Sequence, residues 1–243
     1  MVLERAAELL AGSPSGDVST RAVCEAAGVT QPVLYRLFGD KDGLLSAVAD
    51  FVWEQYLAGK RAAEAGPDPL DDLRAGWDQH TAFALAHPQA YRLVFGSALA
   101  ARPVAIAEAM RLLGAVTTRL ASAGRLCVSA EEAARIVMAA NTGVALGMIL
   151  RPEEVDAASS AEVREATIRG ILAGPAEADP VAVAVTTLRS RLRAGTGEAG
   201  DAFTTAEAAL LDEWLARAAG RPAVHVHRAG PGEPDADASL DPR

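Results

Sequence analysis

The stretch between positions 30 and 41 holds several side chains suited to hydrogen bonding with bases and phosphates. It reads TQPVLYRLFGDK. The carboxamide of Gln31 can pair bidentately with adenine, and the guanidinium of Arg36 can pair with guanine or with a phosphate. Val33 could contact a thymine methyl group. This combination of residue types would allow the segment to read base edges.

Two short helices joined by a tight turn would have to present these side chains. Ser19 can cap the first helix, and Gly28 can supply its left-handed C-terminal residue. Thr30 can cap the second helix, with Pro32 in its first turn, where a missing N–H costs nothing. The pattern predicts a helix-turn-helix whose second helix can lie in the major groove of DNA.

Residues 1–45 as a whole predict a compact three-helix head. An amphipathic helix over about 2–11 precedes the motif. Gly39 and Asp40 end the second motif helix and cap a long helix over about 41–63. The core of the head is expected to consist of apolar residues at helical spacing, namely Ala22, Val23, Ala26, Val29, Leu34, Leu37 and Phe38.

The rest of the chain also predicts helix, so the expected fold class is all-α. Alanine is frequent and β-branched runs are scarce. A helical body is expected over 46–220, followed by a disordered tail over 221–243 that is rich in Pro, Gly, Asp and Ala. The body helices are expected from Leu70 to His87, around Tyr91, from Pro103, and over 129–150, 160–173, 179–194 and 204–219.

The composition argues against several functional classes. The 243 residues carry a formal charge of −9 and only two cysteines, which we expect to be buried thiols in a reducing cytoplasm. His225 and His227 have no acidic or cysteine partner at metal spacing. No GxSxG or HExxH motif occurs, and no apolar stretch is pure enough to span a bilayer. We predict a cytoplasmic protein that is not an enzyme, with no cofactor, metal or membrane partner.

The string around the predicted turn resembles the DNA-binding domain of the tetracycline-repressor (TetR) family. Small residues precede Gly28, then Val29-Thr30, Leu34-Tyr35, Phe38, Lys41 and Leu44-Leu45 follow at the family's spacing. The resemblance implies a homodimer that binds a palindromic operator on double-stranded DNA, and we predict a repressor. Tyr35 would contact the backbone, and Lys41 would clamp a phosphate. The full set of expected DNA-binding residues is Thr20, Arg21, Thr30, Gln31, Pro32, Val33, Tyr35, Arg36 and Lys41.

The resemblance also assigns ligand binding and dimerisation to the body, 46–220. A small hydrophobic or amphipathic effector would bind among its helices and shift the heads. The pocket candidates are aromatic, soft or polar residues at helical positions: Trp53, Tyr56, Trp77, His80, Phe83, Tyr91, Phe95, Met110, Asn141 and Met148. Helices 129–150, with Ala139, Gly143 and Gly147, and 160–173, with an apolar stripe that includes Val163, Ile168 and Ile171, are the expected dimer face. Helix 204–219 extends this face or caps the body. Alternatively, these strips pack inside one subunit.

Two features keep a second hypothesis open. The chain begins directly with Met1-Val2-Leu3-Glu4, without the basic arm of many TetR-family members. Residues 1–45 hold four basic residues (Arg5, Arg21, Arg36, Lys41) and six acidic ones (Glu4, Glu8, Asp17, Glu25, Asp40, Asp42), a net charge of −2. Few phosphate contacts would mean weak non-specific binding. The alternative is therefore a helical sensor or protein-interaction dimer of the same fold with weak or no DNA binding.

Overall fold

The computed structural model describes residues 1–96, 103–173, 180–194 and 203–219. Within these ranges the chain is helical apart from turns, loops and one isolated bridge between Leu126 and Leu172. The expected all-α fold class is therefore confirmed. The tail over 221–243, His225 and His227 included, lies outside the described residues.

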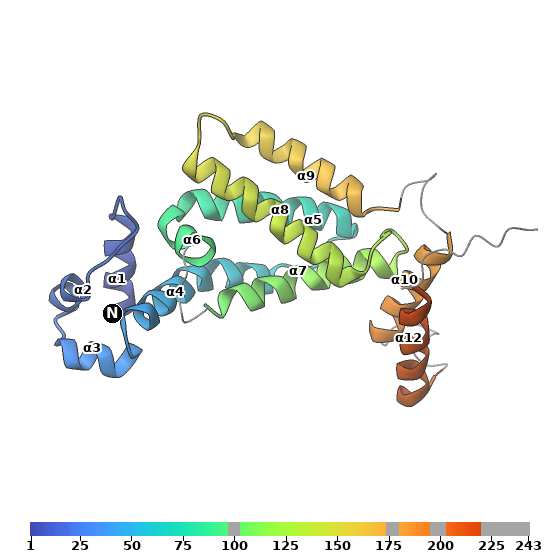
Figure 1. Ribbon diagram of the computed structural model, residues 1–243, viewed down its shortest axis with the longest axis horizontal. Coiled ribbons are helices and arrows are strands. Elements are labelled where there is room, and N and C mark those ends of the chain that lie inside the picture. Colours follow the sequence, from blue (N-terminus) through green and yellow to red (C-terminus); the bar gives the residue numbers. More distant parts are fainter. Residues whose placement is uncertain (97–102, 174–179, 195–202, 220–243) are drawn as a thin grey trace, which may run out of the picture.

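The helices lie close to the positions that the sequence predicts (Figure 1). Their bounds are α1 Val2–Ala11, α2 Thr20–Ala27, α3 Gln31–Phe38, α4 Lys41–Ala62, α5 Pro69–Ala86, α6 Pro88–Phe95, α7 Ala105–Ser122, α8 Ala130–Leu150, α9 Ala157–Ile171, α10 Pro180–Ala194 and α12 Thr205–Ala219. Helix α9 begins three residues earlier than expected because Asp156 caps it, its carboxylate accepting the Ser159 backbone N–H at 2.8 Å.

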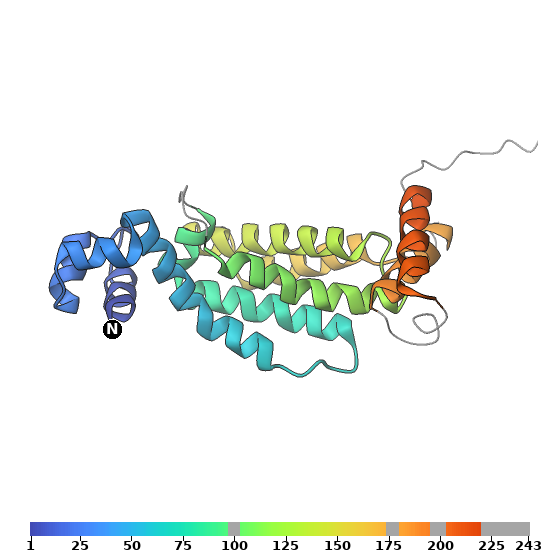
Figure 2. The same ribbon diagram turned by 90° about the horizontal axis from the view of Figure 1, so that it is seen from below.

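The molecule is elongated, with the head formed by α1–α3 at one end (Figures 1 and 2). Helix α4 leads out of the head into the body, where it packs on α6 and α7; α5, α7 and α8 pack against one another, and α9 packs on α8. Helix α1 also contacts α4 and α6. At the far end α10 packs against α7 and α12.

The head core differs from the expected one at two positions. Val23 and Leu34 are fully buried as predicted, whereas Ala26 is exposed and Leu37 is 57% exposed. Cys24 and Ala27 are buried instead, because they lie on the side of α2 that faces its neighbours. The prediction of two buried thiols is right for Cys24, while Cys127 is only partly buried.

A single hydrophobic core connects the head to the body. It runs from Leu10 and Leu34 in the head through Val48 and Trp53 on α4 to Tyr91 on α6. Trp53 is completely buried, and its ring contacts the rings of Tyr56, His80, Phe83, Tyr91 and Phe95. A second core joins α5, α7, α8 and α9. Helix α4 therefore packs against the head and the body at the same time.

Helix α8 corrects the expectation that no apolar stretch of the chain is pure enough to span a bilayer. In the part of the chain that the structure describes, it is long and apolar enough to cross a membrane by length and composition alone. A core helix passes the same test, and α8 packs against α5, α7 and α9. Its apolar character is explained by that packing.

The start of α4 generates a testable prediction. A Cβ on Gly43 would lie 2.0 Å from the backbone oxygen of Phe38, whereas a Cβ on Gly59 of the same helix would meet nothing within 4 Å. We expect Gly43→Ala to destabilise the protein by about 1–3 kcal/mol, because backbone must shift. Gly59→Ala, the matched control, should stabilise it by about 0.5–1 kcal/mol. Urea unfolding measures both, and equal effects of the two substitutions would contradict the close approach at Gly43.

Candidate nucleic-acid interface and body cavity

The turn between α2 and α3 is built by the residues that the sequence singles out. The Ser19 hydroxyl accepts the Ala22 backbone N–H at 3.1 Å. Gly28 adopts the left-handed conformation (φ 64°, ψ 32°), which residues with a Cβ rarely adopt. Thr30 precedes α3, but its side chain makes no capping bond to the helix. Pro32 lies in the first turn, as expected.

Helix α3 exposes most of the residues predicted to contact DNA. Thr30, Gln31, Pro32 and Arg36 are exposed, and Tyr35 is 42% exposed. Val33 is partly buried; on α2, Arg21 is exposed and Thr20 partly buried. Leu34 anchors the opposite face of α3 in the head core. The helix therefore presents hydrogen-bonding and apolar side chains on a rigid, outward surface.

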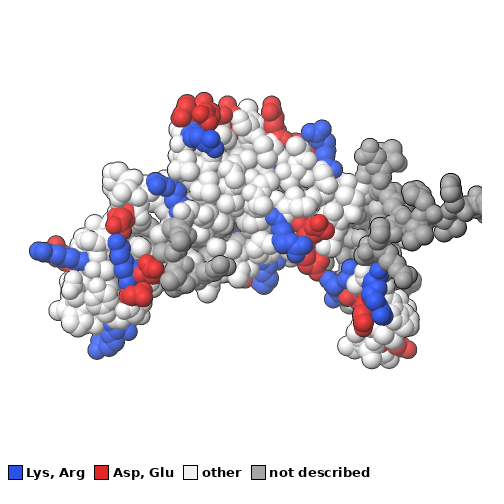
Figure 3. All heavy atoms as spheres, viewed as in Figure 1, with Lys and Arg blue, Asp and Glu red and all other residues white. Residues whose placement is uncertain are grey.

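Several basic side chains of the head form salt bridges within the protein. The Lys41 ammonium lies 2.6 Å from the Asp17 carboxylate, and Arg21 is 2.9 Å from Glu25 on α2. The Lys41 hydrogen bond is the main reason why the pKa of Asp17 is lowered. Among the described head residues, Arg36 is the basic side chain with no carboxylate partner. Basic atoms without acidic neighbours lie over α3 in the face that Figure 3 shows.

A cavity of about 400 Å³ lies in the body between α4, the α4–α5 loop, α5, α7 and α8. Four predicted pocket residues line it: Tyr56, Trp77, His80 and Asn141. The other six do not. Trp53, Phe83, Tyr91 and Phe95 form the ring cluster of the hydrophobic core beside it, Met148 packs in the second core, and Met110 is partly buried on α7 outside the lining.

His80 bridges two tyrosines beside the cavity. Its Nε2 lies 2.8 Å from the Tyr91 hydroxyl, and its Nδ1 lies 3.4 Å from the Tyr56 hydroxyl. Burial, and to a lesser degree the nearby Lys60 charge, lower the pKa of His80 to about 4. Burial raises the pKa of both tyrosine hydroxyls. All three groups are therefore neutral near pH 7 and act as hydrogen-bonding groups.

Asn141 is satisfied by the protein itself. Its side chain accepts the Thr81 hydroxyl at 3.0 Å and donates to the Trp77 carbonyl oxygen at 3.2 Å. The Trp77 indole N–H in turn donates to the Ser160 hydroxyl at 3.1 Å. These bonds tie α5 to α8 and α9 at the cavity wall, so Asn141 has a structural role there.

Sequence reasoning missed Lys60, which also lines the cavity. The available signal was its spacing: Trp53, Tyr56, Leu57 and Lys60 recur at helical intervals on α4. A lysine in line with aromatic residues indicates a side chain whose methylene stem lies along an apolar surface.

The expected dimer helices pack partly inside the subunit. On α9, Ile168 and Ile171 of the apolar stripe are buried in the second core, whereas Val163 is exposed. On α8, Ala139 and Gly143 are exposed, whereas Gly147 packs against Val155, which would lie 3.1 Å from a Cβ at that position. The intrasubunit alternative therefore holds for most of the α9 stripe.

The fold and the exposed motif helix define a class of all-helical proteins that carry a helix-turn-helix head. Residues 2–48 match the family described as "Bacterial regulatory proteins, tetR family". Over these residues, the head of this chain is similar to the regulatory proteins of that family.

Solved structures agree on the fold. A TetR-family transcriptional regulator from Agrobacterium tumefaciens is 22% identical, with a TM-score of 0.52, and the match covers 71% of this chain and 96% of that one. The putative regulatory protein SCO4313 is also 22% identical, with a TM-score of 0.50 and coverage of 70% and 92%. No curated protein matches the chain significantly.

The buried histidine predicts how stability depends on pH. Because the pKa of His80 is about 4 in the fold and 6.5 ordinarily, the unfolded chain binds more protons between these values. The free energy of unfolding should therefore fall on acidification from pH 6.5 to 4, by at most about 3 kcal/mol from this group. His80→Gln should flatten that slope in urea titrations, and His87→Gln, at an exposed position, should leave it in place. An unchanged slope in His80→Gln would contradict the assignment.

Proposed function

We propose that this protein is a transcriptional repressor that binds a palindromic operator as a homodimer and is released by a small effector in the body cavity. The observation that carries the proposal is the exposed face of α3, which presents Gln31, Tyr35 and Arg36 on the second helix of the helix-turn-helix. In this role Gln31 reads a base, Arg36 a base or a phosphate, and Tyr35 the backbone.

A homodimer would double this surface. Two heads related by a two-fold axis would read half-sites about one turn of DNA apart, ~34 Å. The exposed small residues Ala139 and Gly143 on α8 support a close approach between subunits at this helix. Doubling the contacts would also offset the small number of free cations in each head.

Helix α4 supplies the route for release. Its first half is buried in the head core at Leu44 and Val48, and its second half lines the cavity with Tyr56, Leu57 and Lys60. A ligand with different affinities for two positions of α4 would shift the population of head arrangements that fit DNA.

The paired charges of the head favour a second candidate, a helical sensor or protein-interaction dimer with weak or no DNA binding. Arg5, Arg21 and Lys41 each have a carboxylate neighbour, at 2.7, 2.9 and 2.6 Å. A random-oligonucleotide selection with the full chain at low and moderate salt decides between the two. Enrichment of a palindrome supports the regulator, and no enrichment at either salt supports the sensor.

The Lys41–Asp17 salt bridge predicts a gain of binding. Asp17→Asn removes a negative charge beside the DNA-facing surface and frees Lys41 for a phosphate, so affinity should rise and the salt slope should steepen by about one. Glu153→Gln, the same charge change in the body, should have little effect. Fluorescence anisotropy with the selected operator measures both, and equal responses of the two variants would contradict the role of Lys41.

A separate substitution tests base reading. Gln31→Ala should relax the preference at one base position of each half-site, at a cost of ~1–3 kcal/mol on the preferred sequence. Repeating the selection with the variant measures this. Equal losses on the operator and on random DNA would remove Gln31 from direct base contact.

A further inference from the structure

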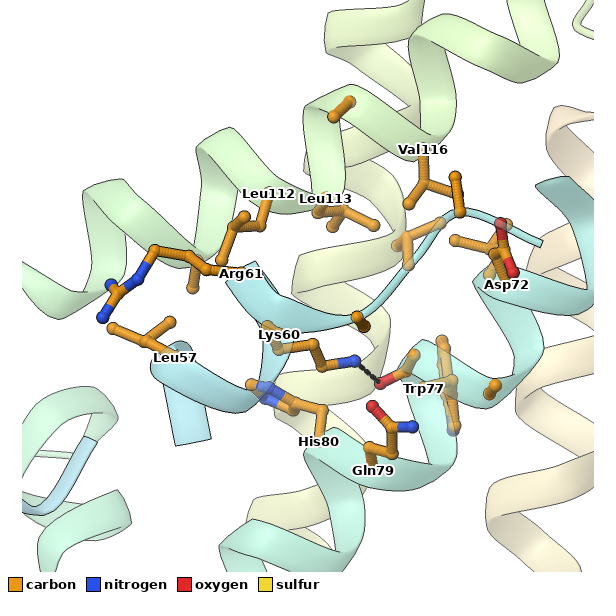
Figure 4. A pocket seen from close by; sticks show the side chains of 18 of the residues that line it. Leu57, Lys60, Arg61, Asp72, Trp77, Gln79, His80, Leu112, Leu113 and Val116 are labelled. Atoms are coloured by element: carbon orange, nitrogen blue, oxygen red, sulfur yellow. Dashed lines mark hydrogen bonds between the residues drawn. The ribbon is translucent and has the colours of Figure 1, made fainter. Parts of the chain in front are cut away.

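Lys60 places a cation beside the cavity without a carboxylate partner among the described residues. Its ammonium donates a long hydrogen bond of 3.4 Å to the Gly76 carbonyl oxygen and lies 5.5 Å from the centre of the Tyr56 ring. Figure 4 shows the side chain reaching from α4 towards α5, with Gln79 and His80 pointing into the same space. An ammonium has three donors, and one long bond leaves it under-satisfied.

The other charged groups at the cavity are accounted for. Arg119 pairs with Asp72, and Arg61 pairs with Glu54 and, at 3.6 Å, with Glu108. Arg61 also points away from Lys60 in Figure 4. Glu64 is exposed. The neighbours of Lys60 include the neutral side chains of His80 and Tyr56, and no described residue supplies it with a counter-ion.

The remaining walls of the cavity are mainly apolar. They come from four helices, α4, α5, α7 and α8, and include Leu57, Leu73, Leu112, Leu113, Val116 and Met138. Such walls can cover the hydrocarbon part of a ligand, and the cavity volume of about 400 Å³ lies in the range of small-molecule sites. A single cation at one side of an apolar cavity fixes the orientation of an amphiphile.

We propose that the cavity binds amphiphiles with one anionic head, a carboxylate in the first instance, whose oxygens pair with the Lys60 ammonium while the hydrocarbon part lies against the apolar walls. Gln79 can donate a further hydrogen bond to the carboxylate. This inference rests on the proposed function, because it names the chemical class of the effector of the same cavity.

The missing counter-ion has a measurable consequence. Burial lowers the pKa of Lys60 to about 8. At mildly alkaline pH, a fraction of the protein molecules therefore carries Lys60 as a neutral amine. A bound carboxylate favours the charged amine and raises this pKa again. The approach of an anion would affect the other nearby titratable groups, His80 and Tyr56, less, since both are neutral at pH 8. Binding at pH 8 should therefore take up a fraction of a proton.

The test compares octanoate with octanamide, which have the same hydrocarbon part. Both are titrated calorimetrically into the full chain at pH 8 in two buffers with different ionisation enthalpies. We expect octanoate to bind about tenfold more tightly or better and to take up protons, as a charge-assisted contact implies, and octanamide to take up none. Equal affinities, or no octanoate binding up to its solubility limit, would overturn the proposal.

Two variants locate the effect. Lys60→Gln should remove the preference for octanoate and its proton uptake, whereas Arg111→Gln, the same charge change at an exposed position outside the cavity lining, should retain both. Retention of the preference in Lys60→Gln would also overturn the proposal. The comparison of the two ligands on the unmodified protein remains decisive if a variant fails to fold.

Release of operator DNA by the two ligands distinguishes a failure of the anionic preference from a failure of the proposed function. If octanoate and octanamide release the selected DNA at the same free ligand concentration, the result would support the regulator and contradict the anionic preference. Preferential octanoate binding by a chain that enriches no DNA would support the preference and contradict the regulator.

Discussion

The burial of one face of α4 is the constraint on which the rest of the structure depends. Leu44, Val48 and Trp53 are each no more than 1% exposed, although they contact different parts of the molecule. Removing any of them from water is favourable by about 1.5–3 kcal/mol, and together they hold the helix against two sets of neighbours. The orientation of the head relative to the body is therefore set by packing along α4, together with the contact between α1 and α6, and a change at the cavity end of α4 can reach the head through this helix.

Salt bridges between helices help to fix the relative orientation of the packed helices. Arg74 joins α5 to α9 through Glu165 at 3.0 Å, and Arg164 joins α9 back to α5 through Asp78 at 2.5 Å. These partly exposed pairs contribute little free energy each, about 0–1 kcal/mol. Their effect on function is larger in the head, because pairing within the protein decides which cations remain for DNA. Among the described residues, Arg36 in the head and Lys60 at the cavity have no such partner.

Local signals made the helices and the motif turn predictable. Ser19, Gly28, Asp40 and Ser129 act at helix ends through their own side chains or backbone conformation, so the sequence alone identifies them. The salt bridge between Lys41 and Asp17 was not predictable, because it joins positions on separate elements whose distance depends on how α1, α2 and α4 pack.

The cavity also depends on packing between separate elements, which the sequence alone does not reveal. Aromatic residues at helical spacing identify a buried stripe, yet only packing decides that Trp53 fills the core while Tyr56, one turn further, borders empty space. The prediction that Leu37 belongs to the head core is wrong, because helix periodicity identifies one face of α3 but not whether another element covers it. The family resemblance indicated the class of protein, whereas the anionic ligand class is proposed from the charges around Lys60.

Amide hydrogen exchange on a Trp53→Leu variant tests most directly whether α4 couples the cavity to the head. The substitution removes ring contacts in the body, more than one helical turn from the head. If the continuous core transmits packing along α4, exchange should accelerate in α1 and α3 as well as in α5 and α6. Acceleration confined to α5, α6 and the second half of α4 would contradict the coupling.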